Sequence, residues 1–242
     1  MLDNQVALIT GAGGGIGKAI ALEFAKAGVN VAVSDINQEQ LVKTLSEIQH
    51  HNSDCFPIVA DMLIPEEIYS MVQSTVDNYG KIDILVNCAG SIILKPFLET
   101  SLNEFRQQMD LHFFATVAAT KASVEYMIGQ GSGKIINMSS ISGTVGYSEH
   151  SAYSPAKGAV IRFSEAIAQE LKSFHINVNC IAPNAVDTGL FDHWQQETGI
   201  APDRTGWIQP QEIGQLAVYL ASPAARSITG ETIVLQGIYP ST

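Results

Sequence analysis

Short apolar runs rich in β-branched residues alternate along this chain with longer segments of helical periodicity. The apolar runs have the length of strands, and a glycine follows several of the helical segments. Strands that alternate with helices are joined by crossover connections, which produce a parallel sheet with helices on both faces. The pattern therefore predicts the α/β class, in which ligands bind beyond the carboxyl ends of the strands.

Apolar periodicity and turn residues set the expected limits of each element. Strands are expected at residues 5–10, 30–35, 55–60, 82–87, 134–138, 176–181 and 231–235. Helices are expected at residues 15–27, 38–50, 65–79 and 101–128, with one that carries Tyr153 and ends near 174 and another that ends near 221. No repeat, charge block or Pro/Gly/Ser-rich linker divides the 242 residues, so we expect one domain over residues 1–242.

Composition and charge exclude several classes of function. The formal charge is −11 and the 13 basic residues are scattered, so no nucleic-acid partner is expected. Apolar runs such as residues 6–9 are too short to span a membrane, and the first residues lack the features of a signal peptide. Cys55, Cys88 and Cys180 are an odd, widely spaced set, which indicates reduced thiols in a cytoplasmic protein. The 6 histidines lack the spacing of metal ligands, so no metal is expected.

A glycine-rich turn follows the first expected strand, where residues 10–17 read Thr-Gly-Ala-Gly-Gly-Gly-Ile-Gly. Glycines permit a tight turn and a close approach to a pyrophosphate, which the amides at a helix N-terminus favour. The same turn is compatible with close packing of any strand against a helix. Asp35, at the end of the second strand, points more directly to a dinucleotide, because a carboxylate there accepts hydrogen bonds from an adenosine ribose.

Asp35 also bears on which dinucleotide binds. A carboxylate repels a 2′-phosphate, and the next residue is Ile36 rather than an arginine, so NAD is expected in preference to NADP. The alternative for Asp35 is a helix cap or a loop carboxylate with no ligand.

Tyr153 and Lys157 are separated by one helical turn and follow Ser140 in the chain. Residues i and i+4 share one face of a helix, so the ammonium of Lys157 is expected near the phenol of Tyr153, where it lowers the pKa of the phenol. A tyrosine tuned in this way exchanges a proton with an alcohol or a carbonyl group. The alternative is a half-buried tyrosine with a solvated lysine on an amphipathic helix.

Taken together, these motifs resemble a known family. The glycine turn, residues 87–90 (Asn-Cys-Ala-Gly), Ser140 and residues 153–157 (Tyr-Ser-Pro-Ala-Lys), in this order and at these separations, resemble the short-chain dehydrogenase/reductase family. The resemblance implies a single-domain, doubly wound Rossmann fold, with a seven-stranded parallel sheet in the order 3-2-1-4-5-6-7 and a small substrate lid at about 188–208. The implied activity is an NAD(H)-dependent interconversion of a secondary alcohol and a ketone.

The resemblance also implies a role for each matching residue. Tyr153 would be the general acid/base, and Lys157 would lower its pKa and hold the nicotinamide ribose. Ser140, rather than Ser139, would bond the substrate oxygen. An aspartate after a strand is equally often a helix cap, so Asp61 has that alternative. The implied cofactor contacts are Gly11, Gly15, Ile16, Gly17, Asp35, Asp61, Met62, Asn87, Ala89, Gly90, Tyr153, Lys157, Val186 and Thr188.

Three positions depart from the pattern of the family. His112 stands where the family has an asparagine that helps to hold a water in a proton path, so it is either a catalytic relay that titrates near neutrality or an ordinary packed histidine. Asn184 replaces a glycine beside the expected nicotinamide, and asparagine tolerates left-handed backbone angles better than most residues. Gln236 replaces an aspartate, which is expected to affect subunit contacts rather than chemistry.

The expected substrate region is largely apolar and does not identify the substrate. Arg204 in the lid either meets an acidic group of the substrate or lies on the surface. The other residues expected in this region are Ser91, Ile92, Ile93, Leu94, Val145, Tyr147, Leu190, Phe191 and Trp194.

Two functions from different classes remain open. One is the enzyme, whose partner is a small-molecule alcohol or ketone. The other is a non-catalytic NAD(H)-binding regulatory protein on the same scaffold, which the three departures suggest but which would not need the serine, tyrosine and lysine. A nucleotide-sugar epimerase shares the tyrosine–lysine chemistry but requires a larger substrate domain. The resemblance further implies a homo-oligomer, a tetramer or dimer, in contact through the long helix ending near Ile128 and the outer face of the Tyr153 helix.

Overall fold

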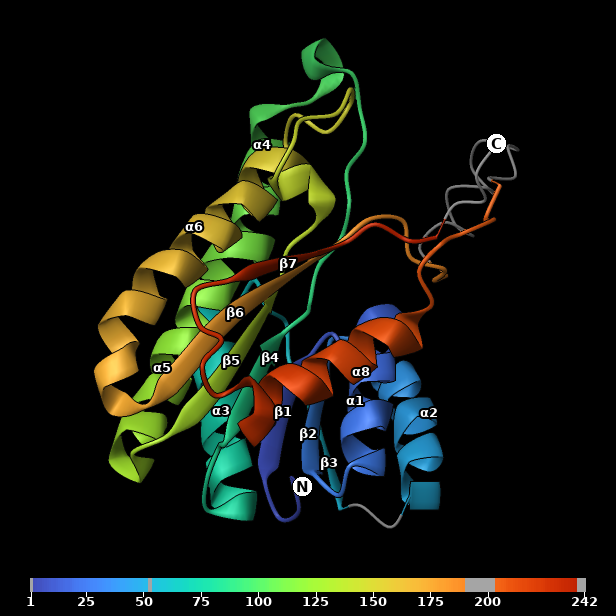
Figure 1. Cartoon of the computed structure of the whole chain (residues 1–242). Coiled ribbons are helices and arrows are strands. Elements are labelled where there is room, and N and C mark those ends of the chain that lie inside the picture. Colours follow the sequence, from blue (N-terminus) through green and yellow to red (C-terminus); the bar gives the residue numbers. More distant parts are fainter. Residues whose placement is uncertain (1, 52–53, 190–202, 239–242) are drawn as a thin grey trace.

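The chain is described by a computed structural model that covers residues 2–51, 54–189 and 203–238. Its strands form one parallel sheet in the order β3-β2-β1-β4-β5-β6-β7 (Figure 1). The predicted class, parallel pairing and strand order are therefore confirmed. The strands are β1 (Val6–Thr10), β2 (Asn30–Asp35), β3 (Cys55–Val59), β4 (Ile84–Asn87), β5 (Gly133–Met138), β6 (Ile176–Pro183) and β7 (Thr232–Leu235).

Helices cover both faces of the sheet, as expected from the sequence. On one face lie α1 (Gly15–Lys26), α2 (Gln38–Ile48) and α8 (Pro210–Ala221) (Figure 1). On the other face lie α3 (Pro65–Tyr79), α4 (Leu102–Met109), α5 (Ala115–Gln130) and α6 (Tyr153–Leu171). Contacts between elements agree with this division, since α1 packs on α8 and α3 packs on α5.

Two large hydrophobic cores fill the space between the sheet and its helix layers, and a third, small cluster of Val160, Ile161 and Cys180 lies between α6 and β6. Phe24 of α1 belongs to the core on the α1 and α8 face, and Met71 of α3 belongs to the opposite core. β1 contributes to both cores, Ile9 to the first and Leu8 to the second, because successive side chains of a strand point to opposite faces. Full burial of a side chain of this size contributes about 2 kcal/mol.

The helix expected at residues 101–128 is not continuous. It begins as α4, where Ser101 and Glu104 form a capping box, and then widens into one π-helical turn at Asp110–Phe114 before α5 begins. This turn carries His112, which is only 3% exposed. Single π turns inside helices are frequent at functional sites. Elsewhere the expected elements are present, with shifts of a few residues at their ends.

Two further features concern disulfides and membrane-spanning helices. Cys55, Cys88 and Cys180 form no disulfide. Among the helices that the structure describes, none is both long and apolar enough to cross a membrane.

Candidate active site

The side chains of Ser140, Tyr153 and Lys157 meet beyond the carboxyl end of β5. Ser140 follows that strand closely, and the other two residues lie in the first turns of α6. A hydrogen bond joins Ser140 to the phenol of Tyr153. Nζ of Lys157 lies 5.7 Å from the centre of the Tyr153 ring. The structure therefore brings the three expected catalytic side chains together.

Lys157 is a buried cation. The residue is 5% exposed, and its Nζ donates a hydrogen bond of 2.8 Å to the carbonyl oxygen of Met138. Burial lowers the pKa of Lys157 to about 8, because an ammonium is poorly solvated inside the protein. The alternative of a solvated lysine on an amphipathic helix is therefore wrong.

The pKa of Tyr153 differs from the expectation. Burial raises it to about 12, and the hydrogen bond with Ser140 offsets only part of this increase. The ammonium of Lys157 lies over the face of the ring and donates a hydrogen bond to the carbonyl oxygen of Met138, and it does not produce the expected lowering of the Tyr153 pKa. In this state the phenol is protonated at neutral pH.

Removal of the buried charge should change how stability depends on pH. Folded Lys157 releases its proton near pH 8, whereas an unfolded lysine holds it to about pH 10.5. Between these values the unfolded state binds more protons, so the free energy of unfolding rises with pH, by on the order of 3 kcal/mol. Lys157→Met lacks this increase. Chemical denaturation should therefore show the wild type gaining stability relative to the variant from pH 8 to 10.5.

Lys43 of α2 supplies the matched control for this measurement. It is exposed, so Lys43→Met removes a charge that water solvates in both the folded and the unfolded state. Its stability difference from the wild type should stay constant with pH. If the difference for Lys157→Met were equally constant, the buried-ammonium interpretation would be wrong.

Ser139 and Ser140 have different partners, which separates their roles. Oγ of Ser139 donates a hydrogen bond of 2.9 Å to the carbonyl oxygen of Lys157, and so ties the end of β5 to α6. Oγ of Ser140 accepts from the backbone N–H of Ser142 at 3.1 Å and bonds Tyr153. A Cβ at Gly143 would lie 2.7 Å from Oγ of Ser139, so only glycine lets this loop pack on α6. Ser140 is therefore the serine that lies with Tyr153.

His112 packs against Tyr153 and against the loop after β4. The two rings meet edge to face with their centres 5.3 Å apart, and Nε2 of His112 lies 2.7 Å from the carbonyl oxygen of Ser91. A carbonyl only accepts, so Nε2 carries the proton and Nδ1 is an acceptor. That acceptor is buried and has no hydrogen-bond partner among the described residues. A Cβ at Gly90 would lie 2.5 Å from Cε1 of His112, so the close packing requires a glycine.

The electrostatic surroundings of His112 contradict titration near neutrality. Burial lowers the pKa of His112 well below 6.5, and the positive charge of Lys157 lowers it further. The hydrogen bond to Ser91 opposes both effects but does not reverse them. The imidazole is therefore neutral from about pH 6.5 upward.

Replacement of His112 by asparagine is expected to leave the midpoints of the pH–rate profile unchanged, because the imidazole is neutral throughout the working range. The value of kcat should fall, since Tyr153 loses the ring packed against it. Steady-state kinetics from about pH 6.5 upward measure both quantities, and His50→Asn on the exposed surface is the control. A wild-type midpoint that disappears in His112→Asn would overturn this interpretation.

The N-terminus of α1 is open to an anion. No side chain caps the first amides of this 12-residue helix, and no acidic residue lies in its first turn. A Cβ at Gly14 would meet nothing within 4 Å, whereas one at Gly11 would lie 2.7 Å from Cα of Ala89 and one at Gly17 would lie 2.1 Å from the carbonyl oxygen of Gly11. Free amides at a helix N-terminus favour a phosphate group. The turn therefore fits the pyrophosphate of a dinucleotide.

Asp35 connects the end of β2 to the glycine turn. Its Oδ2 accepts a hydrogen bond of 2.9 Å from the backbone N–H of Gly13, and its Oδ1 accepts one of 2.9 Å from that of Asn37. Such contacts are those expected if Asp35 serves as a carboxylate that stabilises the loop. Each carboxylate oxygen keeps a second lone pair, so the same side chain can still accept from a ribose hydroxyl.

Val186 and Thr188 lie on the segment after β6. Val186 is 5% exposed and pairs with Ile208 in a short parallel bridge. Thr188 lies beside the glycine turn, since a Cβ at Gly15 would be 3.5 Å from its methyl carbon. Ile16 packs partly against the core behind the turn.

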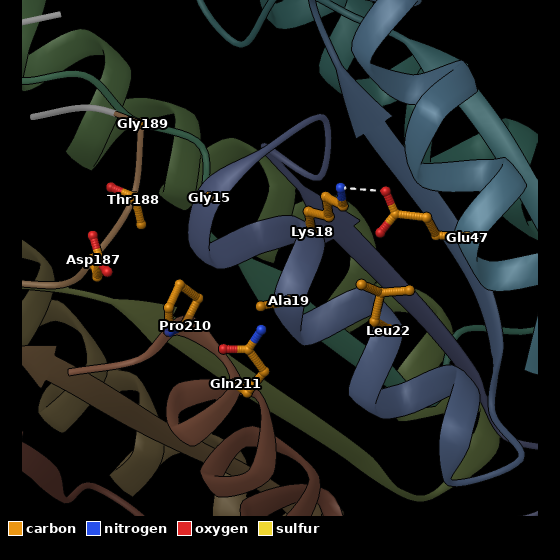
Figure 2. A pocket seen from close by; sticks show the side chains of 10 residues that line it. All are labelled: Gly15, Lys18, Ala19, Leu22, Glu47, Asp187, Thr188, Gly189, Pro210 and Gln211. Atoms are coloured by element: carbon orange, nitrogen blue, oxygen red, sulfur yellow. Dashed lines mark hydrogen bonds and ion pairs between the residues drawn. The ribbon is translucent and has the colours of Figure 1, made fainter. Parts of the chain in front are cut away.

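Figure 2 shows a cavity beside the glycine turn, between the first turns of α1, residues 187–189 and the start of α8. Its volume is about 300 Å³. Lys18 in its wall is already paired with Glu47 at 2.6 Å. Ser140, Tyr153 and Lys157 do not line this cavity.

The remaining expected contacts lie at the ends of β3 and β4. Asn87 is buried, and its Nδ2 donates to Oδ1 of Asn137 at 2.8 Å, so it joins the central strands. Asp61 accepts from the backbone N–H of Leu63 at 2.9 Å, a contact within the loop before α3, whose N-cap is Ile64, so Asp61 is not the helix cap named as its alternative. Met62 beside it is 8% exposed.

The expected lid falls mainly outside the described residues, and Leu190, Phe191 and Trp194 fall there with it. Arg204 is described, and its NH1 pairs with Oδ1 of Asp187 at 2.7 Å. Its guanidinium also lies 5.5 Å from the centre of the Trp207 ring. Arg204 is therefore engaged with the protein itself.

Asn184 does not use the left-handed angle that its residue type permits. Instead its Nδ2 donates to the carbonyl oxygen of Gln236 at 3.4 Å, and its backbone N–H donates to that of Leu235 at 2.8 Å. The side chain thus links the segments that follow β6 and β7.

A family comparison agrees with this geometry. The model of the short chain dehydrogenase family matches residues 5–199 of the chain. The chain belongs to this family. Over 241 residues this short-chain dehydrogenase is 34% identical to the 3-oxoacyl-(acyl-carrier-protein) reductase of Synechocystis sp., with 98% of this chain and 97% of the relative covered.

Solved structures similar to this short-chain dehydrogenase include enzymes with different cofactors. One is an NAD⁺-bound xylitol dehydrogenase, with a TM-score of 0.90, 27% identity, and 98% of this chain and 99% of that chain covered. Another is a variant of actinorhodin polyketide ketoreductase with NADPH, with a TM-score of 0.90, 27% identity and 96% of each chain covered. Both likenesses extend over nearly the whole chain.

Several contacts in the site of this short-chain dehydrogenase were not expected from its sequence. The carbonyl oxygens of Met138 and Ser91 hold Lys157 and His112, and no residue pattern marks a backbone acceptor. His150 was also missed, although its ring centre lies 6.2 Å from that of Tyr153. His150 lies shortly before Tyr153 in the sequence, just ahead of the helix that begins at Tyr153, and this position could have identified it.

Proposed function

We propose that this short-chain dehydrogenase interconverts a secondary alcohol and a ketone with NAD(H). The observation that carries the proposal is the hydrogen-bonded pair of Ser140 and Tyr153 beside a buried Lys157. The uncapped N-terminus of α1 supports a dinucleotide as the second reactant. Membership of the family supports an oxidoreductase that acts on CH–OH groups.

In the proposed reaction the nicotinamide, when bound, supplies or accepts the hydride, and the protein moves the proton. Tyr153 gives its phenolic proton to the ketone oxygen in reduction and takes the hydroxyl proton in oxidation. A pKa of about 12 keeps Tyr153 protonated at neutral pH, which is the form that reduction requires. The hydroxyl of Ser140 bonds the same substrate oxygen and holds it against the phenol.

Lys157 and His112 have supporting roles in this proposal. The ammonium of Lys157 stabilises the negative charge that develops on Tyr153 in oxidation, and it offers its remaining hydrogens to the nicotinamide ribose. His112 is a positioning residue that packs against the Tyr153 ring. A relay through its imidazolium is not part of the proposal, because burial disfavours the charged ring.

NAD(H) is proposed in preference to NADP(H) because Asp35 places a negative charge at the end of β2, next to the glycine turn. The NAD⁺-bound xylitol dehydrogenase supports this choice. The similar ketoreductase structure contains NADPH, so the fold alone is compatible with either cofactor. In our proposal the side chains at residues 35 and 36 decide the preference between NAD(H) and NADP(H).

The substrate class is open to direct measurement. Ile92, Ile93 and Leu94 are partly buried in the loop after Gly90, which favours a substrate with an apolar part. A panel of hydroxysteroids, sugars, polyols including xylitol, 3-oxoacyl thioesters and cyclic ketones should be tested with both cofactors by NAD(P)H absorbance. Turnover of at least one substrate is expected. Cofactor binding with no turnover across the panel would favour the regulatory-protein alternative.

We further propose a homo-oligomer, a dimer or tetramer, that contacts through the α5 region and the outer face of α6. Phe114, just before α5, and Ile128, near its end, are 55% and 39% exposed. The ring of Phe113 packs on that of Phe163 at 5.9 Å and joins the two helices into one surface. Light scattering after gel filtration measures the assembly, and a monomer at all concentrations would exclude it.

A further inference from the structure

A second cavity lies at the end of the sheet opposite to Ser140 and Tyr153. It is formed where β5 and β6 begin, beside the end of α6 and the connection from α8 to β7 (Figure 1). Its volume is about 490 Å³, within the range of small-molecule sites. The lining includes Lys134, Lys172, His175, Asn177, Arg226 and Ser227.

Positive charge collects in this cavity without acidic partners. Lys134, Lys172 and Arg226 line it, in a chain whose formal charge is −11, and no Asp or Glu is among the lining residues. None of the ion pairs found among the described residues involves these three side chains. By contrast, Lys18 and Lys81 each pair with a carboxylate. Three of the basic side chains without an ion pair in the described part of the chain therefore gather in this one cavity.

The side chain of Lys134 is held by one hydrogen bond and can donate to a further acceptor. Its Nζ donates a hydrogen bond of 2.5 Å to Oδ1 of Asn177. The orientation of that amide is set, because its Nδ2 donates to the carbonyl oxygens of Arg226 at 3.1 Å and Ile228 at 3.0 Å. An ammonium has three donors, and this is the one hydrogen bond of Nζ among the described residues. Burial alone lowers the pKa of Lys134, with no carboxylate to oppose it.

We infer that this cavity binds a multivalent oxyanion, a small metabolite that carries a phosphoryl group or several carboxylates. The planar guanidinium of Arg226 binds two oxygens of such a group at once. Lys134 adds a positioned charge, and Ser227 and Lys172 add further donors. The site lies at the amino ends of β5 and β6, so it is separate from the dinucleotide site and does not depend on the proposed reaction.

Isothermal titration calorimetry tests this inference on the full chain, with NADH present at saturation. Inorganic pyrophosphate and citrate are titrated separately at matched ionic strength. We expect saturable binding of at least one probe with a Kd of about 1 mM or lower, and the tighter probe indicates whether the natural group is phosphoryl or carboxylate. Arg226→Gln and Lys134→Gln should each weaken binding by about tenfold. Lys43→Gln removes an exposed charge elsewhere and should leave the Kd unchanged.

Equal affinity in the wild type and Arg226→Gln would overturn the inference, because it would place the probe elsewhere, for example at the glycine turn. The absence of saturable binding for both probes would also overturn it. Arg226 is exposed, so its substitution should preserve the fold, which the thermal midpoint checks. If Lys134→Gln fails to fold, the result for Arg226→Gln decides.

Discussion

Tyr153→Phe is expected to lower kcat by about 1,000-fold while leaving the affinity for NADH within about twofold of the wild type. The substitution removes the group that exchanges the proton and the hydrogen bond with Ser140. It keeps the ring, so the edge-to-face contact with His112 and the place of the ring under the Lys157 ammonium are retained. The loss should therefore fall on the chemical step rather than on cofactor binding.

The measurement combines steady-state kinetics on the best substrate of the panel with a fluorescence titration of NADH. Tyr69→Phe on α3 is the matched control, because it removes the same hydroxyl from a side chain that is 50% exposed and distant from the site in sequence. It should retain full activity. Equal activity of Tyr153→Phe and the wild type would remove Tyr153 from the mechanism.

The fold was predictable because its signals are local and repeated. The run from Val6 to Thr10 is completely buried, and a strand buried on both faces is apolar at nearly every position, which the sequence displays directly. The placement of helices on both faces of the sheet then follows from the alternation of strands and helices along the chain. The π turn at His112 was not predictable, because inserting a wider turn changes the helical register without any distinct residue pattern.

The grouping of Ser140, Tyr153 and Lys157 was predictable from the sequence, but the pKa values of these residues were not. The spacing of Tyr153 and Lys157 places both on one face of a helix, and the structure groups them as expected. The predicted direction of the pKa change in Tyr153 was wrong, because that pKa depends mainly on burial, while the ammonium of Lys157 donates a hydrogen bond to the carbonyl oxygen of Met138. Such quantities arise from long-range packing, which the residue spacing does not contain.

The second large effect is expected at Asp35. The wild type should bind NADH at least about 100-fold more tightly than NADPH, because a carboxylate beside a 2′-phosphate costs several kcal/mol. Asp35→Ser combined with Ile36→Arg should reverse the preference, since the charge at the end of β2 then changes from negative to positive. The ratio of the two Kd values, measured by fluorescence titration, reports this change directly. A wild type that prefers NADPH would remove NAD from the proposal.

The structural role of Asp35 requires a second comparison. Its carboxylate accepts from Gly13 and Asn37, so a variant at residue 35 also loosens the glycine turn and should lower the affinity for both cofactors. Ile36 is 65% exposed, so Ile36→Arg alone adds a cation without breaking those bonds and should tighten NADPH binding by about tenfold while NADH is unaffected. Ile36→Gln is the uncharged control. If Asp35→Ser lowers the affinities for NADH and NADPH equally, with no change in the ratio of the two Kd values, the role of Asp35 is limited to its contacts within the loop. A shifted ratio requires the carboxylate to face the ribose.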